Sequence, residues 1–172
     1  MRRLNVMSRD AEFNTAQIRV IGADVIKHLK MSAEQSPRRR CRLCLHYSEA
    51  MLTQEMIIVC CRDTFMPPHR HPPGKSESYH VIEGGMTVYY FNDHGAVIDH
   101  TDLAEPGQGK PFFVRLSEPV WHMPVPSSRW LVYHETYSGP FRKEHDVIFP
   151  DWSPSEYDKE NVAQFMKRVT RK

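Results

Sequence analysis

The sequence lacks a long apolar run. No segment approaches the roughly 18 consecutive apolar residues that a membrane-spanning helix needs. Arg2 and Arg3 near the N-terminus are followed by no apolar segment of the kind found in secretory signal peptides. We therefore expect a soluble, cytoplasmic protein that does not associate with membranes.

The sequence also lacks an excess of charge of one sign. Its 23 lysines and arginines nearly balance 21 acidic residues, which gives a formal net charge of +2. Nucleic-acid-binding domains carry a clear surplus of basic residues, usually on one face. We expect no nucleic-acid partner, and an anionic substrate would have to be held by a few local groups.

Cysteine is scarce, and its arrangement argues against a zinc site. Cys41 and Cys44 have the spacing of half a zinc knuckle, but the other two, Cys60 and Cys61, are adjacent. Adjacent side chains on a strand point to opposite faces and cannot converge on one metal ion. We interpret all four as reduced, small buried residues.

The 172 residues contain no internal repeat or low-complexity segment, so we expect one domain. Residues 24–34 place apolar side chains on one helical face, with Asp24 as the expected N-cap and Pro37 ending the element. A second helix is predicted near the C-terminus, where Ser153 opens a capping-box pattern and the last turn is basic. Both helices would flank the domain.

Short segments rich in β-branched and aromatic residues fill the region between these helices, separated by Gly, Pro, Asn and Asp. Residues 92–95, Asn-Asp-His-Gly, form a clear hairpin signal. Many short antiparallel strands predict an all-β sandwich or barrel. The expected strands lie within residues 39–47, 55–63, 78–84, 86–92, 96–103, 111–116, 122–126 and 130–137.

A cluster of histidines lies in residues 67–80, PPHRHPPGKSESYH. His69 and His71 are separated by one residue, so on an extended segment both imidazoles project to the same face. Glu77 would reach the same metal ion if the Pro-Pro-Gly sequence before it forms a loop, whereas His80 would point the opposite way. From spacing alone, a metal site and a solvated histidine loop are both open interpretations.

These residues resemble the two cupin motifs. The pattern His69-x-His71, then Glu77, then Val-Ile-Glu-Gly at residues 81–84 is similar to the first motif, and SEPVWHMPVP around His122 is similar to the second. The resemblance implies that His69, His71, Glu77 and His122 are metal ligands. Five residues separate His71 from Glu77, which is a longer loop than the usual pattern.

The wider sequence, including SPRRRCRLCLH, FNDHGAV, PVWH and SGPF, resembles the WbuC-type family of cupin-fold metalloproteins over nearly the whole chain. This resemblance implies an all-β cupin-type antiparallel β-sandwich or barrel (jelly roll) in a single domain, 1–172. Residues 1–36 would form an N-terminal strand and helix extension, 37–137 the barrel core, and 138–172 a C-terminal loop and helix. It also favours a homodimer.

The implied ligand set of three imidazoles and one carboxylate suits one divalent metal ion, Fe, Mn, Ni, Co or Zn, and leaves two positions of an octahedral sphere for other ligands. The family is often encoded with genes for O-antigen or other surface polysaccharides. We therefore expect a metal-dependent enzyme that acts on a small sugar or nucleotide-sugar intermediate of surface-polysaccharide biosynthesis. The alternatives are an Fe(II)-dependent dioxygenase, a non-catalytic cupin that binds a sugar or metabolite as a sensor or assembly factor, and a purely structural metal site.

A second group of polar residues could bind substrate. Arg40, Arg42 and His46 share one face of the expected strand 39–47, where the arginines could clamp a phosphate or carboxylate. The alternative is a solvated face on an edge strand.

Tyr79 follows Glu77 by two residues and should face the same interior, either as a hydrogen-bonding group beside the metal or as a core aromatic. Residues 130–137, apolar on both faces near their start, predict a central strand, from which His134 or Glu135 are secondary candidates for the pocket.

Overall fold

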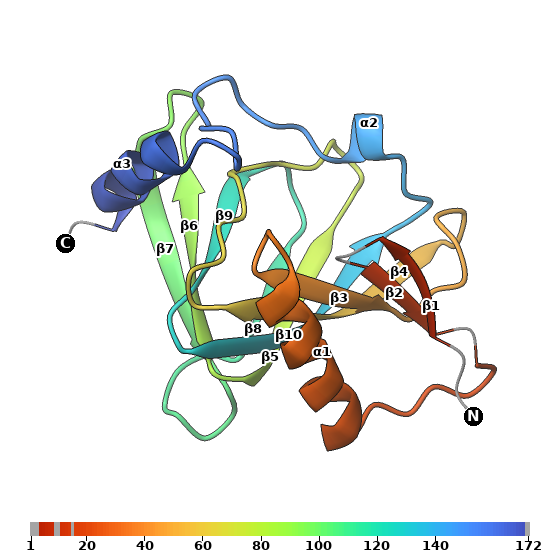
Figure 1. The fold of residues 1–172 in the computed structure, drawn as a ribbon. Coiled ribbons are helices and arrows are strands. Elements are labelled where there is room, and N and C mark those ends of the chain that lie inside the picture. Colours follow the sequence, from red (N-terminus) through yellow and green to blue (C-terminus); the bar gives the residue numbers. More distant parts are fainter. Residues whose placement is uncertain (1–3, 9–10, 15, 171–172) are drawn as a thin grey trace.

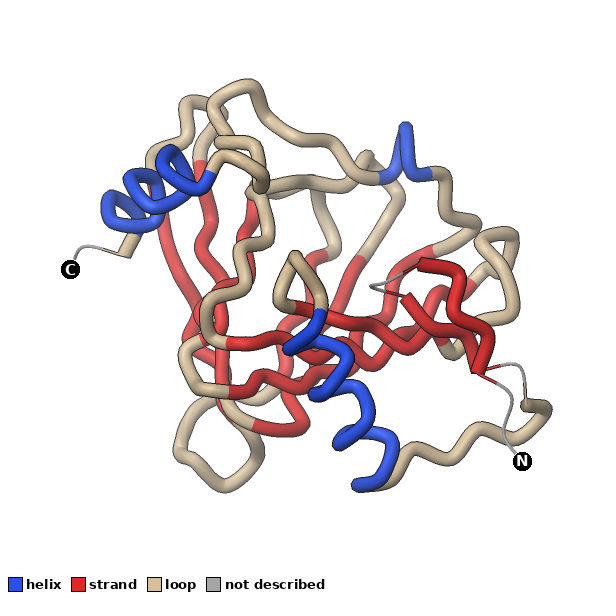
Figure 2. Tube along the Cα trace, viewed as in Figure 1, coloured by secondary structure: helices blue, strands red, loops and turns tan. Residues whose placement is uncertain are grey.

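The computed structural model describes residues 4–8, 11–14 and 16–170. Within these residues two β-sheets face each other, and the helices lie at the periphery (Figures 1 and 2). The larger sheet has the strand order β1-β2-β3-β4-β10-β5-β8, and the smaller has β7-β6-β9. The chain order is β1 (Leu4–Ser8), β2 (Ala11–Asn14), α1 (Ala23–Gln35), β3 (Arg40–Cys44), β4 (Thr53–Cys61), β5 (Glu77–Glu83), β6 (Gly85–Phe91), β7 (Val97–Ala104), β8 (Phe113–Leu116), β9 (Trp121–Pro126), β10 (Trp130–Ser138), α2 (Lys143–Asp146) and α3 (Lys159–Val169).

The main core lies between the two sheets and is built by alternate residues of their strands, as the strand period requires. Ile58 and Cys60 of β4 face this interior, whereas Ile57, Val59 and Cys61 face outward against α1. Strand β4 is therefore apolar on both faces. The interior cluster contains Cys44, Met56, Ile58, Cys60, Tyr79, Val81, Met86, Val88, Leu103, Leu131 and Tyr133.

Helix α1 covers the outer face of β3 and β4 through Leu29 and Ala33, which are both fully buried. This confirms the predicted N-terminal helix, but Gly22 occupies the N-cap position and Asp24 lies in the first turn. The predicted cap was therefore two residues too late. An acidic residue in the first turn still complements the helix dipole.

The C-terminal helix is confirmed, but it begins later than expected. Residues 151–157 form turns, and α3 starts after Asp158, whose carboxylate accepts a hydrogen bond from the Asn161 N–H at 3.1 Å. Ser153 is thus not the N-cap. Several S/T/D residues precede the helix, and only the turn geometry selects the one that caps it.

The structure contains strands in each of the eight predicted segments between residues 39 and 137. Strand β10 is central, paired with β4 on one side and β5 on the other. The hairpin between β6 and β7 closes at residues 92–96, where the Asn92 N–H donates to the Ala96 carbonyl and Gly95 adopts a φ of 78°. Strand β3 lies between β2 and β4, so it is not the edge strand that one interpretation assumed.

The four cysteines are buried and carry free thiols, as predicted. Cys60 faces the main core and Cys61 the layer under α1, so the adjacent pair diverges as strand geometry requires. In the residues the structure describes, no helix is long and apolar enough to cross a membrane.

Candidate metal centre

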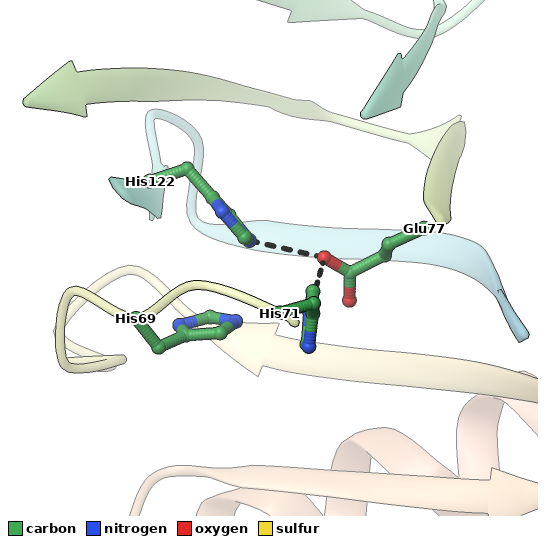
Figure 3. A group of neighbouring side chains, drawn as sticks. All are labelled: His69, His71, Glu77 and His122. Carbon is green, nitrogen blue, oxygen red and sulfur yellow. Dashed lines mark hydrogen bonds and ion pairs between the residues drawn. The ribbon is translucent and has the colours of Figure 1, made fainter. Parts of the chain in front are cut away.

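Three histidines and one glutamate meet at one end of the space between the sheets (Figure 3). Glu77 is the first residue of β5, His122 is the second residue of β9, and His69 and His71 lie on the extended segment 67–71. One ligand atom from each of the four residues lies within 4.8 Å of the others. The cluster could therefore hold one metal ion.

Backbone pairing brings these side chains together from separate parts of the sequence. His69 and His122 exchange two backbone hydrogen bonds, at 3.0 and 2.9 Å, so the segment 67–71 pairs with the edge of β9. On its other side, Arg70 exchanges two hydrogen bonds of 3.0 Å with Ile148. Because Arg70 and the two histidines alternate, its guanidinium lies over the Trp121 ring, outside the cluster, while the imidazoles face inward.

The longer loop between the ligands folds as a tight turn. The Lys75 N–H donates to the Pro72 carbonyl at 3.2 Å, and Gly74 takes a φ of 81°, a left-handed conformation that glycine adopts without strain. The turn places Glu77 Oε2 3.1 Å from His71 Nε2. The extra loop residue is thus absorbed before β5 begins, and Glu77 reaches the histidines.

The three imidazoles share one orientation. His69 Nδ1 lies 3.0 Å from the Pro67 carbonyl, and His122 Nδ1 lies 2.9 Å from the Val120 carbonyl. His71 Nδ1 lies 2.6 Å from the carbonyl of Asp146, 75 residues further along the chain. A carbonyl can only accept, so each Nδ1 carries its hydrogen and each neutral ring presents the Nε2 lone pair. Such outer hydrogen bonds are typical of metal-binding histidines.

The carboxylate meets these lone pairs directly. Glu77 Oε2 is 3.0 Å from His122 Nε2 and 3.1 Å from His71 Nε2, as the dashed lines in Figure 3 show. With neutral imidazoles that carry Nδ1–H and an ionised carboxylate, Glu77 Oε2 and the two Nε2 atoms are all acceptors, and the Tyr79 hydroxyl is the donor beside them. A cation between the acceptors, either a shared proton or a metal ion, would stabilise this arrangement, and the ligand set fits a metal ion.

The pKa values reflect this crowding. Burial disfavours ionisation of Glu77, but in the metal-free protein its interactions with the His122 and His71 imidazoles outweigh burial and hold its pKa well below the usual range. For His71, burial is likewise outweighed by the hydrogen bond and charge of Glu77, so its pKa is raised. Burial, reinforced by His122, lowers the pKa of His69 to about 3. His69 therefore stays neutral at every physiological pH and is ready to bind a metal.

Tyr79 serves as both core aromatic and hydrogen-bonding neighbour. Its side chain is 1% exposed, and its hydroxyl donates to Glu77 Oε2 at 2.7 Å. The same hydroxyl lies 3.2 Å from His122 Nε2. Burial raises the Tyr79 pKa well above its ordinary value, so the hydroxyl remains a donor. The two interpretations of Tyr79 were not exclusive, because a tyrosine can bury its ring and direct its hydroxyl at a polar site.

Glu135 of β10 is a further acidic neighbour. It pairs across the sheet with Tyr79, and its carboxyl lies close enough to Glu77 for the charge of Glu77 to affect its ionisation. Burial, together with the negative charge of Glu77, raises the Glu135 pKa well above its ordinary value. A carboxyl that stays protonated at neutral pH can donate to Glu77. Of the two secondary candidates, Glu135 reaches the cluster, whereas His134 lies on the opposite face of β10, 3.6 Å from Glu55.

The substrate residues predicted on strand 39–47 are dispersed: Arg40 and Arg42 lie on β3, and His46 lies just after it. The Arg40 guanidinium lies 3.1 Å from Glu156 and 2.7 Å from the Phe65 carbonyl, so it ties the C-terminal segment to the barrel. His46 is buried, and its Nδ1 lies 3.1 Å from the Glu55 carbonyl. Arg42 is exposed and contributes a positive charge near Glu135. None of the three contacts the metal cluster, and their role in substrate binding stays a prediction.

Sequence reasoning missed the contribution of the segment that follows β10. Asp146, in the short helix α2, supplies the carbonyl that orients His71, and the Tyr137 hydroxyl donates to the same carbonyl at 3.3 Å. A backbone acceptor leaves no residue signature, so no sequence pattern could have identified Asp146. Tyr137 had a weak signal, since it continues the inward-facing parity of Glu135.

Comparisons with known proteins bear on the fold. The model of a family described as Domain of unknown function (DUF6016) matches residues 21–103, slightly less than half of the chain. No curated protein is matched. Among solved structures, protein SO0799 from Shewanella oneidensis is 11% identical, with a TM-score of 0.54 over 76% of this chain and 85% of that chain.

Two further structures are similar in fold. Oxalate oxidase in complex with the substrate analogue glycolate is 12% identical, with a TM-score of 0.50 over 66% of this chain and 56% of that chain. CapF with the inhibitor 3-isopropenyl-tropolone is 13% identical, with a TM-score of 0.53 over 67% of this chain and 32% of that chain. This chain thus spans about half of the oxalate oxidase chain and a third of the CapF chain.

At these identities the likeness concerns the fold alone. Two facing antiparallel sheets with peripheral helices, and neighbours of jelly-roll architecture, confirm the all-β cupin prediction. The finer resemblance to the WbuC-type family stays a prediction. The chain is a protein of cupin fold with a His/Glu cluster that could bind a metal ion.

Proposed function

We propose that this protein binds one divalent transition-metal ion through His69, His71, Glu77 and His122 and is a metal-dependent enzyme. One observation carries the proposal: each Nδ1 lies against a backbone carbonyl, the Nε2 atoms of His71 and His122 lie within 3.1 Å of Glu77 Oε2, and a ligand atom of His69 lies within 4.8 Å of the other ligand atoms. Metal affinity in proteins depends on such preoriented, deprotonated ligands. Four protein ligands leave positions for substrate or water in an octahedral sphere.

A divalent ion held here would act as a Lewis acid on a substrate oxygen or lower the pKa of a bound water. The residues of the chain have separate tasks around it. The Tyr79 hydroxyl donates to Glu77, which fixes the carboxylate and moderates its charge, and the pKa of the nearby Glu135 carboxyl is raised by burial and by the charge of Glu77. A carboxyl with a raised pKa beside the cluster could supply a proton.

The substrate class that we propose is a small oxygen-rich molecule, a sugar or nucleotide-sugar intermediate of surface-polysaccharide biosynthesis. This part rests on the resemblance to the WbuC-type family. Arg42 supports it from the structure, because its exposed guanidinium lies on the inward-facing side of β3 and near Glu135, where a phosphate or carboxylate could be held. We expect a homodimer on the same resemblance.

The test begins with elemental analysis of protein purified without an affinity tag, because a polyhistidine tag would itself carry metal. We expect about one equivalent of a divalent metal per chain. Metal-reconstituted protein is then incubated with a panel of sugar nucleotides and free sugars, and products are detected by mass spectrometry. Oxygen uptake with Fe(II) would identify the dioxygenase alternative, and an absence of bound metal after reconstitution with all five candidate ions would refute the proposal.

A non-catalytic metal-dependent binding protein is the second candidate, and the burial of the cluster favours it. His71, Glu77 and His122 are 8%, 3% and 1% exposed. Two surface cavities of about 420 and 600 Å³ lie elsewhere, one beside α3 and one over the outer face of β6 and β7. Saturable binding of a sugar that is recovered chemically unchanged in the presence of excess metal would establish this alternative.

A further inference from the structure

The orientation of His71 depends on a distant part of the chain, unlike that of the other two histidines. His69 and His122 donate to carbonyls two residues earlier in their own segments. His71 donates to Asp146, which lies at the end of α2. The local backbone alone therefore cannot hold this ring, and the placement of α2 decides where its Nε2 points.

Asp146 is itself held firmly. Its residue is 4% exposed, and its Oδ2 accepts a hydrogen bond from the Arg142 N–H at 2.8 Å. The Lys75 ammonium lies 3.5 Å from the same oxygen. Tyr137 adds a hydroxyl donor to the Asp146 carbonyl at 3.3 Å, and its ring lies 4.6 Å from the His71 ring.

Lys75 completes the connection from the ligand loop. It belongs to the turn between His71 and Glu77, and its ammonium donates to the carbonyls of Ser138 at 3.0 Å and Pro140 at 2.6 Å. Its side chain is 19% exposed, so the ion pair with Asp146 is better shielded than a surface pair. One lysine thus joins the loop that carries two proposed ligands to the segment that orients one of them.

We propose that Lys75 and Asp146 form a clasp that positions His71 for metal binding, and that metal binding in turn holds the segment 142–149 in place. This inference rests on the proposed metal site. Neither residue is a ligand, and both act through His71. Because thermodynamic coupling is reciprocal, a clasp that raises metal affinity must be tightened when the metal binds.

The experiment compares the full-length wild type with Lys75→Met, which keeps most of the side-chain volume and removes the charge. Zn(II) affinity is measured by competition with a chelator, and hydrogen exchange of residues 142–149 is followed with and without Zn(II). We expect a 10- to 100-fold weaker affinity for Lys75→Met, the range seen on loss of groups that orient ligands. In the wild type, Zn(II) should slow exchange in 142–149, and this protection should largely vanish in the variant.

Two further variants separate the clasp from a general effect. Lys110→Met removes an exposed ion pair with Asp102 at 3.2 Å, outside the cluster, and should leave both measurements unchanged. Asp146→Asn keeps the carbonyl but weakens the ion pair, and it provides the test if Lys75→Met does not fold. Lys75→Arg should restore part of the affinity.

The possible failures are distinguishable. A wild type that binds no metal at all contradicts the proposed function. A wild type that binds Zn(II), with Lys75→Met and Asp146→Asn binding equally tightly and showing equal protection of 142–149, overturns the clasp alone.

Discussion

Replacing His122 by alanine is the most direct perturbation of the candidate metal centre. His122 is 1% exposed, and its Nε2 lies 3.0 Å from Oε2 of Glu77, which belongs to the other sheet. A bound ion would lose the candidate ligand that lies on β9 of the smaller sheet. His69, His71 and Glu77 would remain.

The magnitude follows from the ligand count. Structural zinc sites with four protein ligands contribute about 10–16 kcal/mol at neutral pH, or roughly 2.5–4 kcal/mol for each ligand. Loss of one ligand should therefore weaken binding roughly 100- to 1,000-fold. The metal-free variant should also be destabilised by about 1–3 kcal/mol, since Val120 loses the donor to its carbonyl and Glu77 loses one neighbour.

The assay is a chelator competition titration with Zn(II) on metal-free protein, with circular dichroism to show that the variant is folded. His100→Ala is the matched control, because His100 is exposed on β7 and lies outside the cluster. Its affinity should equal that of the wild type. Full stoichiometry and unchanged affinity in folded His122→Ala would refute the proposed ligand set.

Two other predictions concern stability. The folded-state pKa of His69, about 3, is below its unfolded value near 6.5, so the neutral form is favoured in the folded protein and stability is lost as pH falls below 6.5. In metal-free protein the loss of stability amounts to about 2 kcal/mol between pH 7 and 5, while the raised pKa of His71 acts in the opposite direction. In urea unfolding, the change in the free energy of unfolding over this pH range should differ by that amount between wild type and His69→Asn. Parallel pH profiles of the two proteins would contradict the prediction. Leu29→Ala, in the fully buried face of α1, should lower the free energy of unfolding by about 2–5 kcal/mol without changing metal affinity. The control Met31→Ala, at a 53% exposed position of the same helix, should change it by no more than about 0.5 kcal/mol. Equal urea midpoints for the two variants would show that α1 contributes little to the fold.

The sequence was informative about β-structure because the strands are short, alternate regularly and are separated by turn residues. The hairpin at residues 92–96 needs a left-handed position, and Gly95 provides it. The ends of the helices were harder to predict from the sequence than their central residues. Apolar spacing identified both, but the caps at Gly22 and Asp158 depend on how the preceding chain leaves the barrel.

The candidate ligands were named from two motifs, and the structure brings all four together. The loop before Glu77 was the part of the ligand set that the sequence left open. Its length alone could not tell whether the carboxylate would return to the histidines, because that depends on the turn at Gly74 and on where β5 starts. Parity along β5 then placed Tyr79 beside Glu77 correctly, since alternate residues of a strand share one face.

Residues whose partners lie far away in sequence escaped prediction. Arg40 shares its strand face with Arg42, yet only the tertiary structure brings Glu156 to it. Parity fixes the face of a strand but not what covers that face. The same limit applies to Glu135, whose electrostatic interaction with Glu77 exists because β10 and β5 are neighbours in the sheet.

The sequence by itself thus determined an all-β domain with flanking helices, because period-2 patterning is a local property. It also supplied the two motifs whose resemblance to the cupin motifs implies the four candidate ligands. Only the tertiary structure decided how those side chains are held. The orientation of His71 comes from a backbone carbonyl at Asp146 and a lysine at position 75. A carbonyl is common to every residue, so its role is set by position in space and cannot be read from the residue that carries it.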